Sequence, residues 1–348
     1  MNRSVIKVLS LFSGLLAGLW AAGCKEKPAT PETKTHATAP LPPGVPRQWL
    51  EPAEAGDAEA QYHLGLLLYY GYKTPRTQEE AVEMFQRAVQ ERLTGQGHTP
   101  RIDYSRNDGV TMNAEEGLKW LRKAGESGHA WAQYHLGDIY ANGKGIPADP
   151  KEGARWYLKA AEKGNGWSQY HLAHMLAKGT GVECNAAEAA KWFRYAAEQG
   201  IIHAQYDLGY RLSSGDGVPK NPEEARVWLH KAAEADHSWA QFNLAVLLLE
   251  GSGGPRNPED AAKWFEQSAQ QGNAESQYML GTMYARGQGV PRDFYEAYKW
   301  VNLAVARAPQ PYYKTFRKSL EDRLSPGQLQ EAGRWATAFV PRKSNLIP

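Results

Sequence analysis

The spacing of apolar residues in segment 201–236 predicts two helices joined by a turn. Each helix is indicated by a stripe of apolar or small residues three or four positions apart; the stripes are Ala204, Leu208 and Leu212, and Ala225, Trp228 and Ala232. Gly215 suits the left-handed residue that ends the first helix. Asn221 can accept from the exposed amides of the second helix, and Pro222 fits its first turn. The segment therefore predicts a helix–turn–helix unit.

The unit recurs with a period of 36 residues. Tryptophan returns at this interval at Trp120, Trp156, Trp192, Trp228, Trp264 and Trp300. A glutamine followed by an aromatic residue returns at multiples of it, at Gln61-Tyr62, Gln133-Tyr134, Gln169-Tyr170, Gln205-Tyr206, Gln241-Phe242 and Gln277-Tyr278. A fixed period of this length indicates stacked units, none of which buries its apolar face alone. We therefore predict an all-α fold, an α/α solenoid of seven helix pairs over residues 49–308, with this tryptophan column in its core.

The second unit departs from the pattern in segment 93–112. Gly95, Gly97 and Pro100 are poor helix formers, although the register of the repeat survives. We predict a loop or a broken helix in this segment, followed by an intact second helix at about 113–127.

The repeated residues resemble those of a known family. The unit has the pattern Ala-x-Ala-Gln-Tyr-x-Leu-Gly-x-x-Tyr-x-x-Gly-x-Gly-Val-Pro…Glu-Ala…Trp…Ala-Ala-Glu-x-Gly. This pattern is similar to the Sel1-like repeat, most closely in 129–164 and 273–293. The resemblance covers about 57–308 and implies a right-handed superhelix of paired helices that acts as an adaptor, related to tetratricopeptide arrays. It also implies capping helices and a tail in 309–348. Cysteine-rich members staple each helix pair with a disulfide, and this chain lacks those cysteines.

The first 23 residues have the pattern of a secretory signal. Arg3 and Lys7 provide the positive start, and an apolar run follows from Val8 to Ala22. The end of the run, Leu19-Trp20-Ala21-Ala22-Gly23-Cys24, resembles a bacterial lipobox, which predicts a signal peptide over 1–23 and a lipid on Cys24. The alternative is ordinary signal cleavage with Cys24 as a bystander.

The residues after Cys24 extend this prediction. Lys25 is typical of lipoproteins sent to the outer membrane, so we expect a lipid-anchored protein of the bacterial cell envelope that faces the periplasm. Segment 24–48 is rich in proline and has almost no large apolar groups, which predicts a disordered tether of up to roughly 70 Å. The formal charge of +2 comes from the acid-free signal segment, and a neutral body argues against a nucleic-acid partner.

The chain offers little for catalysis or cofactor binding. The Gly-x-Gly pairs follow predicted helices once per unit, which favours turns over phosphate loops. His63, His135 and His171 share one column, but stacked units lie too far apart for these residues to chelate one metal, so we interpret the column as a solvated or groove-lining face. The pattern Ser-x-x-Lys occurs only at Ser4–Lys7, and no other nucleophile and base can be paired. We therefore expect no enzyme activity, no metal and no cofactor. Cys184 occupies an exposed loop position, where an interchain disulfide is the alternative to a free thiol.

A second set of tryptophans has a different character. Trp131, Trp167 and Trp239 share a column with Glu59, and a position that accepts glutamate is not a sealed core. The resemblance to tetratricopeptide arrays implies that this column lines a concave groove, together with residues three and seven positions further on. The candidate binding residues are Trp131, Tyr134, Asp138, Trp167, Tyr170, His174 and Trp239. Partial packing against the preceding unit remains the alternative.

These observations favour an adaptor that binds a peptide or protein segment. A binder of cell-wall glycans is the second hypothesis, because rows of tryptophan also stack on sugar rings. A β-lactamase-like envelope hydrolase is a distant third.

Overall fold

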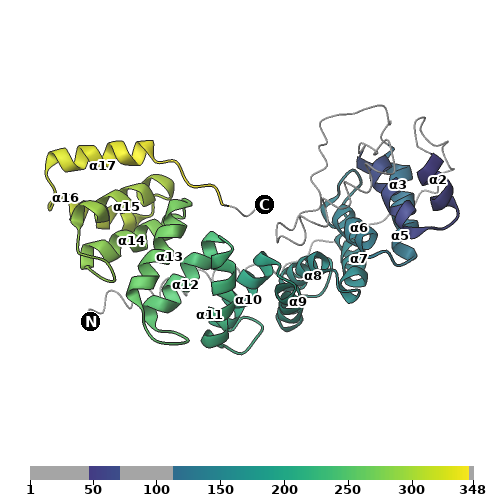
Figure 1. Cartoon of the computed structure of the whole chain (residues 1–348), viewed down its shortest axis with the longest axis horizontal. Helices are drawn as coiled ribbons and strands as arrows, with labels where there is room; N and C mark the ends of the chain where they lie inside the picture. The colour runs from purple at the N-terminus through teal and green to yellow at the C-terminus, as the bar shows by residue number, and fades with distance from the viewer. Residues whose placement is uncertain (1–46, 71–112, 345–348) are drawn as a thin grey trace. The chain divides into compact units, whose positions relative to one another are not determined.

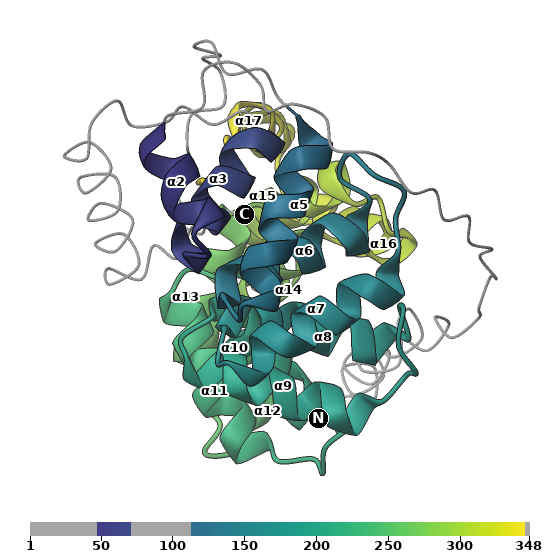
Figure 2. The same ribbon diagram turned by 90° about the vertical axis from the view of Figure 1, so that its right-hand side faces the viewer.

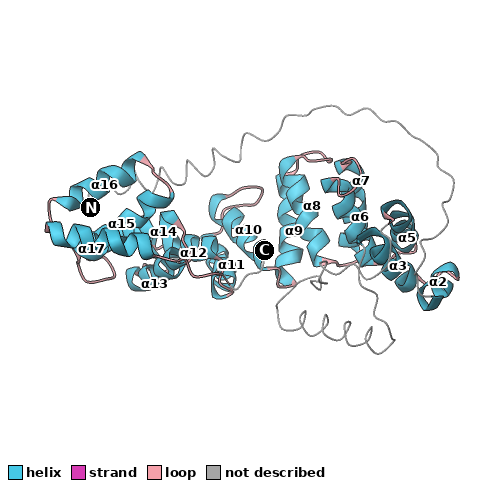
Figure 3. Ribbon diagram, turned by 90° about the horizontal axis from the view of Figure 1, so that it is seen from above, coloured by secondary structure: helices cyan, strands magenta, loops and turns pink. Residues whose placement is uncertain are grey.

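The computed structural model describes residues 47–70 and 113–344. All regular secondary structure in these two ranges is α-helical, as Figure 3 shows, which confirms the all-α solenoid predicted from the repeat. The expected signal peptide, most of the tether and the irregular segment 93–112 lie outside the described residues.

The helices repeat at the predicted interval. The first helices of the repeats are α3 (Ala58–Tyr70), α6 (Ala130–Asn142), α8 (Gly166–Lys178), α10 (Ile202–Ser214), α12 (Ser238–Glu250) and α14 (Ala274–Arg286). The second helices are α5 (Ala114–Glu126), α7 (Pro150–Glu162), α9 (Ala186–Glu198), α11 (Pro222–Glu234), α13 (Pro258–Gln270) and α15 (Phe294–Arg307). From α6 and α5 onward, each series starts every 36 residues. Helix α5 lies where the sequence predicts the second helix of the irregular unit.

Three further helices flank the repeats. Helix α2 (Arg47–Glu54) precedes them, so the expected tether ends with two residues that are helical. Helices α16 (Pro311–Glu321) and α17 (Pro326–Ala338) follow them. In the described ranges, no helix combines the length and the apolar character that crossing a membrane requires.

The described residues fall into two compact units that divide between Ile201 and Ile202, which we call the N-terminal and the C-terminal half. In the N-terminal half α3 packs against α5, α6 against α7 and α8 against α9 (Figure 2). In the C-terminal half α10 pairs with α11, α12 with α13 and α14 with α15, and α15 also packs against α16 and α17 (Figure 1). Within each half, most consecutive pairs are joined by contacts between a second helix and the next first helix.

Side chains at the helix ends account for the sharp boundaries. The amide of Glu224 donates to Oδ1 of Asn221 at 3.1 Å, which is the cap predicted for α11. Gly215 has φ +85°, as expected for the residue that ends α10. In the same repeat the predicted apolar stripes are fully or almost fully buried.

The recurring glutamine ties each repeat to the preceding helix. Its side-chain amide donates to the backbone carbonyl eight residues earlier, in Gln61 to Ala53 (3.0 Å), Gln133 to Gly125 (2.8 Å), Gln169 to Ala161 (3.1 Å), Gln241 to Ala233 (3.2 Å) and Gln277 to Ala269 (3.0 Å). These carbonyls lie at helix ends, where no intrahelical donor is available. Each carbonyl also accepts the backbone amide three residues further on, as Gly125 does from Gly128 at 3.1 Å, so the glutamine supplies a second donor that links the repeat to the end of the preceding helix.

The tryptophan column is core at four positions and only partly core at two. Trp120, Trp156, Trp228 and Trp300 are buried. Trp192 and Trp264 are only half-buried, so the prediction of a uniformly sealed column is wrong there. Trp192 contacts Tyr195, whose side chain is 50% exposed, and Trp264 contacts the exposed ring of His230. Neither ring contact closes the tryptophan off from solvent.

The Gly-x-Gly pairs form the turns after the first helices, as predicted. The second glycine also allows a close contact with the preceding repeat. A Cβ atom on Gly289 would lie 2.2 Å from the carbonyl oxygen of Pro258, which starts α13, and the backbone there has φ +72°. Only glycine satisfies both requirements.

Candidate functional site

The second set of tryptophans shares one packing geometry. Trp131 meets Tyr134 edge to face with ring centroids 5.6 Å apart, and Trp167 meets Tyr170 in the same way at 6.2 Å. In the C-terminal half Trp239 meets Phe242 at 5.8 Å. Each pair spans three positions of a first helix, so the predicted faces are formed. Edge-to-face contact favours the ring quadrupoles and fixes each tryptophan in one orientation.

His171 joins the two pairs of the N-terminal half. Its ring lies 5.9 Å from Tyr134 and 5.5 Å from Tyr170, and it stacks on Tyr157 at 5.2 Å. His174 continues the series, 4.6 Å from Tyr170. We call this continuous set of rings on α6, α7 and α8 the aromatic row; it comprises Trp131, Tyr134, Tyr157, Trp167, Tyr170, His171 and His174.

Two members of the aromatic row were not among the residues predicted from sequence. Tyr157 lies on a second helix, directly after Trp156 of the core column, and was not assigned a role from the sequence. His171 belongs to the histidine column with His63 and His135, which was interpreted as solvated or groove-lining. The structure instead buries His135 and half-buries His171. The histidine that recurs directly after the Gln-aromatic pair was the sequence signal that could have identified His171.

The tryptophans of the row are only partly covered. Trp131 and Trp167 are half-buried, and Trp239 is 38% exposed. Trp156, in the other column, is 4% exposed. Each ring therefore packs against an aromatic residue of its own helix and presents its remaining surface to solvent.

Asp138 occupies the row's margin as half of an ion pair. Its carboxylate accepts from Lys144 Nζ at 2.6 Å and from Asn142 Nδ2 at 2.8 Å. Burial, with a smaller contribution from the Asp138 charge, raises the pKa of Tyr134 and of Tyr157 far above the usual range. Both phenols stay protonated and neutral at physiological pH.

Burial also keeps two histidines neutral, namely His171 of the aromatic row and the neighbouring His135. It lowers the pKa of His135 to about 4 and that of His171 to about 4, although the Asp138 charge opposes both shifts. Near pH 7 the aromatic row therefore carries no net positive charge from these two rings.

The first repeat replaces the tryptophan by a carboxylate. Glu59 accepts from Nε2 of His129 at 2.8 Å and from Nε2 of His63 at 3.0 Å, and these bonds hold its pKa well below the usual range. Tyr62 stacks on His129 with centroids 4.4 Å apart. This end of the half is polar and internally paired, in contrast to the apolar row on α6 and α8.

The described residues show no arrangement suited to a metal ion. Within 47–70 and 113–344, no three His, Cys, Asp or Glu side chains gather closely enough to hold a metal ion. Cys184 is exposed, as its loop position predicts, and its sulfur lies 3.5 Å from the carbonyl oxygen of Ala177.

Paired helices with a fixed 36-residue period define the chain as an α-helical repeat protein. A sequence model of the family described as Sel1 repeat matches residues 58–91, 103–129, 132–165, 168–201, 202–237, 240–273 and 274–308. These segments make up most of the chain, which therefore belongs to the Sel1 repeat family. Sel1 repeat proteins are generally protein-interaction scaffolds, and their solenoid is typically not an enzyme fold.

Two solved structures illustrate the similarity. The Sel1 repeat protein from Oxalobacter formigenes shares 27% identity, with a TM-score of 0.53, over 75% of this chain and 98% of that one. A protective antigen with the SLR fold from uropathogenic Escherichia coli shares 24% identity, with a TM-score of 0.34, over 86% of this chain and 95% of that one. A comparison with curated proteins finds no match.

Proposed function

We propose that this chain is a non-catalytic adaptor whose aromatic row binds a peptide or protein segment. The observation that carries the proposal is the partial exposure of Trp131 and Trp167, whose rings are held by edge-to-face contacts within their own helices. Trp156 is sealed in the core, whereas Trp131 and Trp167 keep part of each indole in water. Leaving apolar area exposed forgoes the gain from burial, about 25 cal/mol per Å². Partly exposed aromatic rings in fixed orientations are the usual anchors of protein interfaces.

The chemistry of the row favours an apolar or aromatic ligand segment. Its phenols are neutral, and His171 is neutral near pH 7. Asp138, the carboxylate at its margin, is already paired with Lys144. Covering such a surface desolvates few charged groups, so binding forfeits little hydration energy. Trp239 and Phe242 offer a similar pair in the C-terminal half.

Substituting the exposed tryptophans tests this proposal. Trp131→Ala, Trp167→Ala and Trp239→Ala should each lower partner recovery in pull-downs from envelope extracts, and we expect Trp167→Ala to weaken binding at least about tenfold. Tyr195→Ala is the control, because Tyr195 is an aromatic residue that is 50% exposed but lies on a second helix outside the row. Full recovery by the Trp167→Ala variant would place the binding surface elsewhere. Enrichment of wild-type protein on isolated cell wall, without a protein partner, would favour the glycan alternative.

We further propose that a lipid on Cys24 anchors the chain in the bacterial envelope, at the outer membrane facing the periplasm. The support is the lipobox-like sequence that ends in Cys24, the Lys25 that follows it and the proline-rich segment beyond. A tether of this composition would hold the repeats away from a lipid surface.

Metabolic labelling with palmitate tests the anchor. Cys24→Ala should abolish labelling, whereas Cys184→Ala should retain it, because only Cys24 follows the signal pattern. Globomycin, which blocks lipoprotein signal cleavage, should leave segment 1–23 attached. Unchanged palmitate incorporation in the Cys24→Ala variant would exclude lipidation at this residue.

A further inference from the structure

One loop position distinguishes the repeat that begins with α12 from the other repeats. The residue two positions before each first helix has a left-handed backbone, and it is glycine at Gly56, Gly128, Gly164, Gly200 and Gly272. Asp236 occupies the equivalent position with φ 69°, and among the described residues it alone has positive φ without being glycine. A Cβ atom makes this conformation less favourable than it is for glycine. An aspartate at a position that favours glycine therefore indicates that its side chain has a function.

The Asp236 carboxylate is held in place by two glutamines. Gln271 Nε2 donates to its Oδ1 at 2.9 Å and Gln241 Nε2 at 3.2 Å. The glutamines are themselves linked, because Gln271 Nε2 also donates to Gln241 Oε1 at 2.8 Å. The Asp236 side chain is only 12% exposed. These bonds come from α12 and the loop after α13, so the carboxylate is oriented before any further partner arrives.

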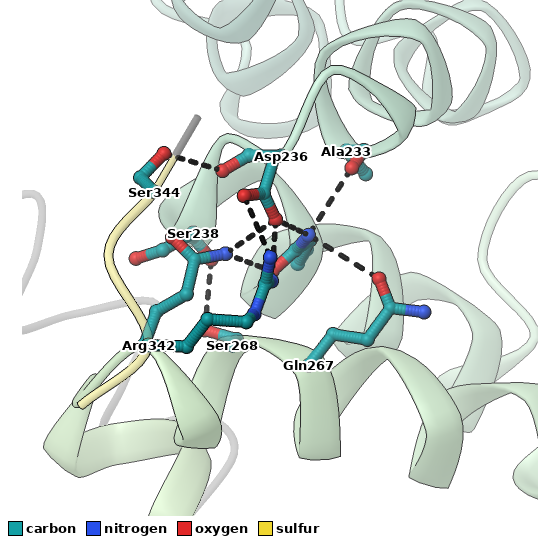
Figure 4. Close-up of polar contacts among 9 residues, drawn as sticks. Ala233, Asp236, Ser238, Gln267, Ser268, Arg342 and Ser344 are labelled. Atoms are coloured by element: carbon teal, nitrogen blue, oxygen red, sulfur yellow. Dashed lines mark hydrogen bonds and ion pairs between the residues drawn. The ribbon is translucent and has the colours of Figure 1, made fainter. Parts of the chain in front are cut away.

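That further partner is the guanidinium of Arg342. Its Nη1 donates to Asp236 Oδ2 at 2.9 Å and its Nη2 to Asp236 Oδ1 at 2.6 Å, as Figure 4 shows. Such a two-pronged contact matches the planar fork of arginine and cannot be reproduced by lysine. Lys343 is the adjacent cation, and its side chain is exposed.

Arg342 reaches the site on an extended segment rather than on a helix. After α17 ends, Phe339 packs against Trp335 and Trp300, at 5.4 and 6.2 Å between ring centroids. The segment then crosses the loops that precede α12 and α14. The amide of Arg342 donates to the Gln270 carbonyl at 2.8 Å. The Ser344 hydroxyl donates to the Asp236 carbonyl at 3.2 Å, as Figure 4 shows. Main-chain and side-chain bonds of this kind are those of a bound peptide.

We propose that Asp236, Gln241 and Gln271 form a recognition site for arginine in an extended peptide, and that segment Pro341–Ser344 fills this site in cis. A partner with an arginine in an extended segment displaces the chain's own segment and takes over its bonds. Attachment to α17 gives the cis segment a high effective concentration, so it lowers the apparent affinity for any peptide added in trans. This site is separate in its residues and its chemistry from the aromatic row.

The test uses a fluorescent peptide with the sequence of residues 339–344, Phe-Val-Pro-Arg-Lys-Ser, and the full chain. The Arg342→Ala variant leaves the site vacant and should bind the peptide at least about tenfold more tightly than the wild-type chain does. Lys343→Ala is the matched control and should bind like wild type. A peptide with lysine in place of its arginine should bind the Arg342→Ala variant at least about tenfold more weakly.

A second variant separates recognition from folding. Asp236→Gly restores the glycine of the other repeats, so it removes the carboxylate without straining the backbone. Combined with Arg342→Ala, it should abolish peptide binding while the thermal melting curve is retained. The proposal is wrong if the peptide fails to bind the Arg342→Ala variant or if the arginine and lysine peptides bind equally well. The contact between Asp236 and Arg342 would then be an intramolecular contact that only stabilises the fold. A wild-type dimer that Asp236→Gly dissociates would show that a second copy, rather than the same chain, supplies the segment.

Discussion

Trp156→Ala is expected to lower the free energy of unfolding by about 3–5 kcal/mol. Trp156 lies in a cluster with Leu121, Leu136 and Ile139, each of which is fully buried, and it is itself 4% exposed. Removing the indole leaves a cavity where successive repeats meet. Because stability in a repeat array sums over neighbouring interfaces, the loss should also uncouple the repeats on either side and broaden the melting transition.

Two other tryptophans provide matched controls for Trp156→Ala. Trp192 occupies the same column but is half-buried, so Trp192→Ala should destabilise the chain clearly less. Trp167→Ala should cost about 1 kcal/mol, more than the roughly 0.5 kcal/mol typical of a fully exposed position, because Trp167 is half-buried and part of its indole already lies in water. Circular dichroism melting curves of the three variants give the comparison. If Trp167→Ala melts as early as Trp156→Ala, the aromatic row is a packing feature and its assignment as a binding surface is wrong.

The repeat and its helices could be predicted because each depends on local sequence. Apolar spacing, the Asn221 cap and the Gly215 left-handed residue act within a few positions, and the 36-residue period shows them repeatedly. The pairing of Trp131 with Tyr134 follows from helical geometry alone, which places positions three apart on one face.

The remaining features depend on contacts between distant parts of the chain. The bond from Gln133 to the Gly125 carbonyl explains the glutamine column, but it needs the angle between two helices. The exposure of Trp192 depends on which ring lies beside it. Arg342 and Asp236 are 106 residues apart, and no periodic pattern links them. Asp236 alone carried a signal, since it replaces glycine in an otherwise uniform loop position.

Acid should destabilise the fold through its buried histidines. Burial lowers the pKa of His135 from 6.5 to about 4 in the folded chain, whereas the unfolded histidine takes up its proton near 6.5. Between these pH values the unfolded state binds more protons, so stability falls as the pH falls. The contribution of neutral His135 to the free energy of unfolding is complete above pH 6.5, declines down to about pH 4 and is constant below that. The total loss amounts to roughly 3 kcal/mol. His171, with its pKa lowered to about 4, acts in the same direction.

Urea unfolding at a series of pH values between 4 and 7 measures this dependence. His135→Gln should flatten it, because a neutral side chain replaces the buried ring, even if the variant is less stable at pH 7. His230→Gln is the matched control, because the His230 side chain is 51% exposed, and this variant should keep the wild-type dependence. Carboxylates titrate in the lower part of the same range and contribute equally to both variants, so the difference between the two curves isolates His135. If the curves for His135→Gln and wild type are parallel, the His135 ring gains its proton without unfolding of the chain. Water would then reach the ring through a local separation of α6 from α7.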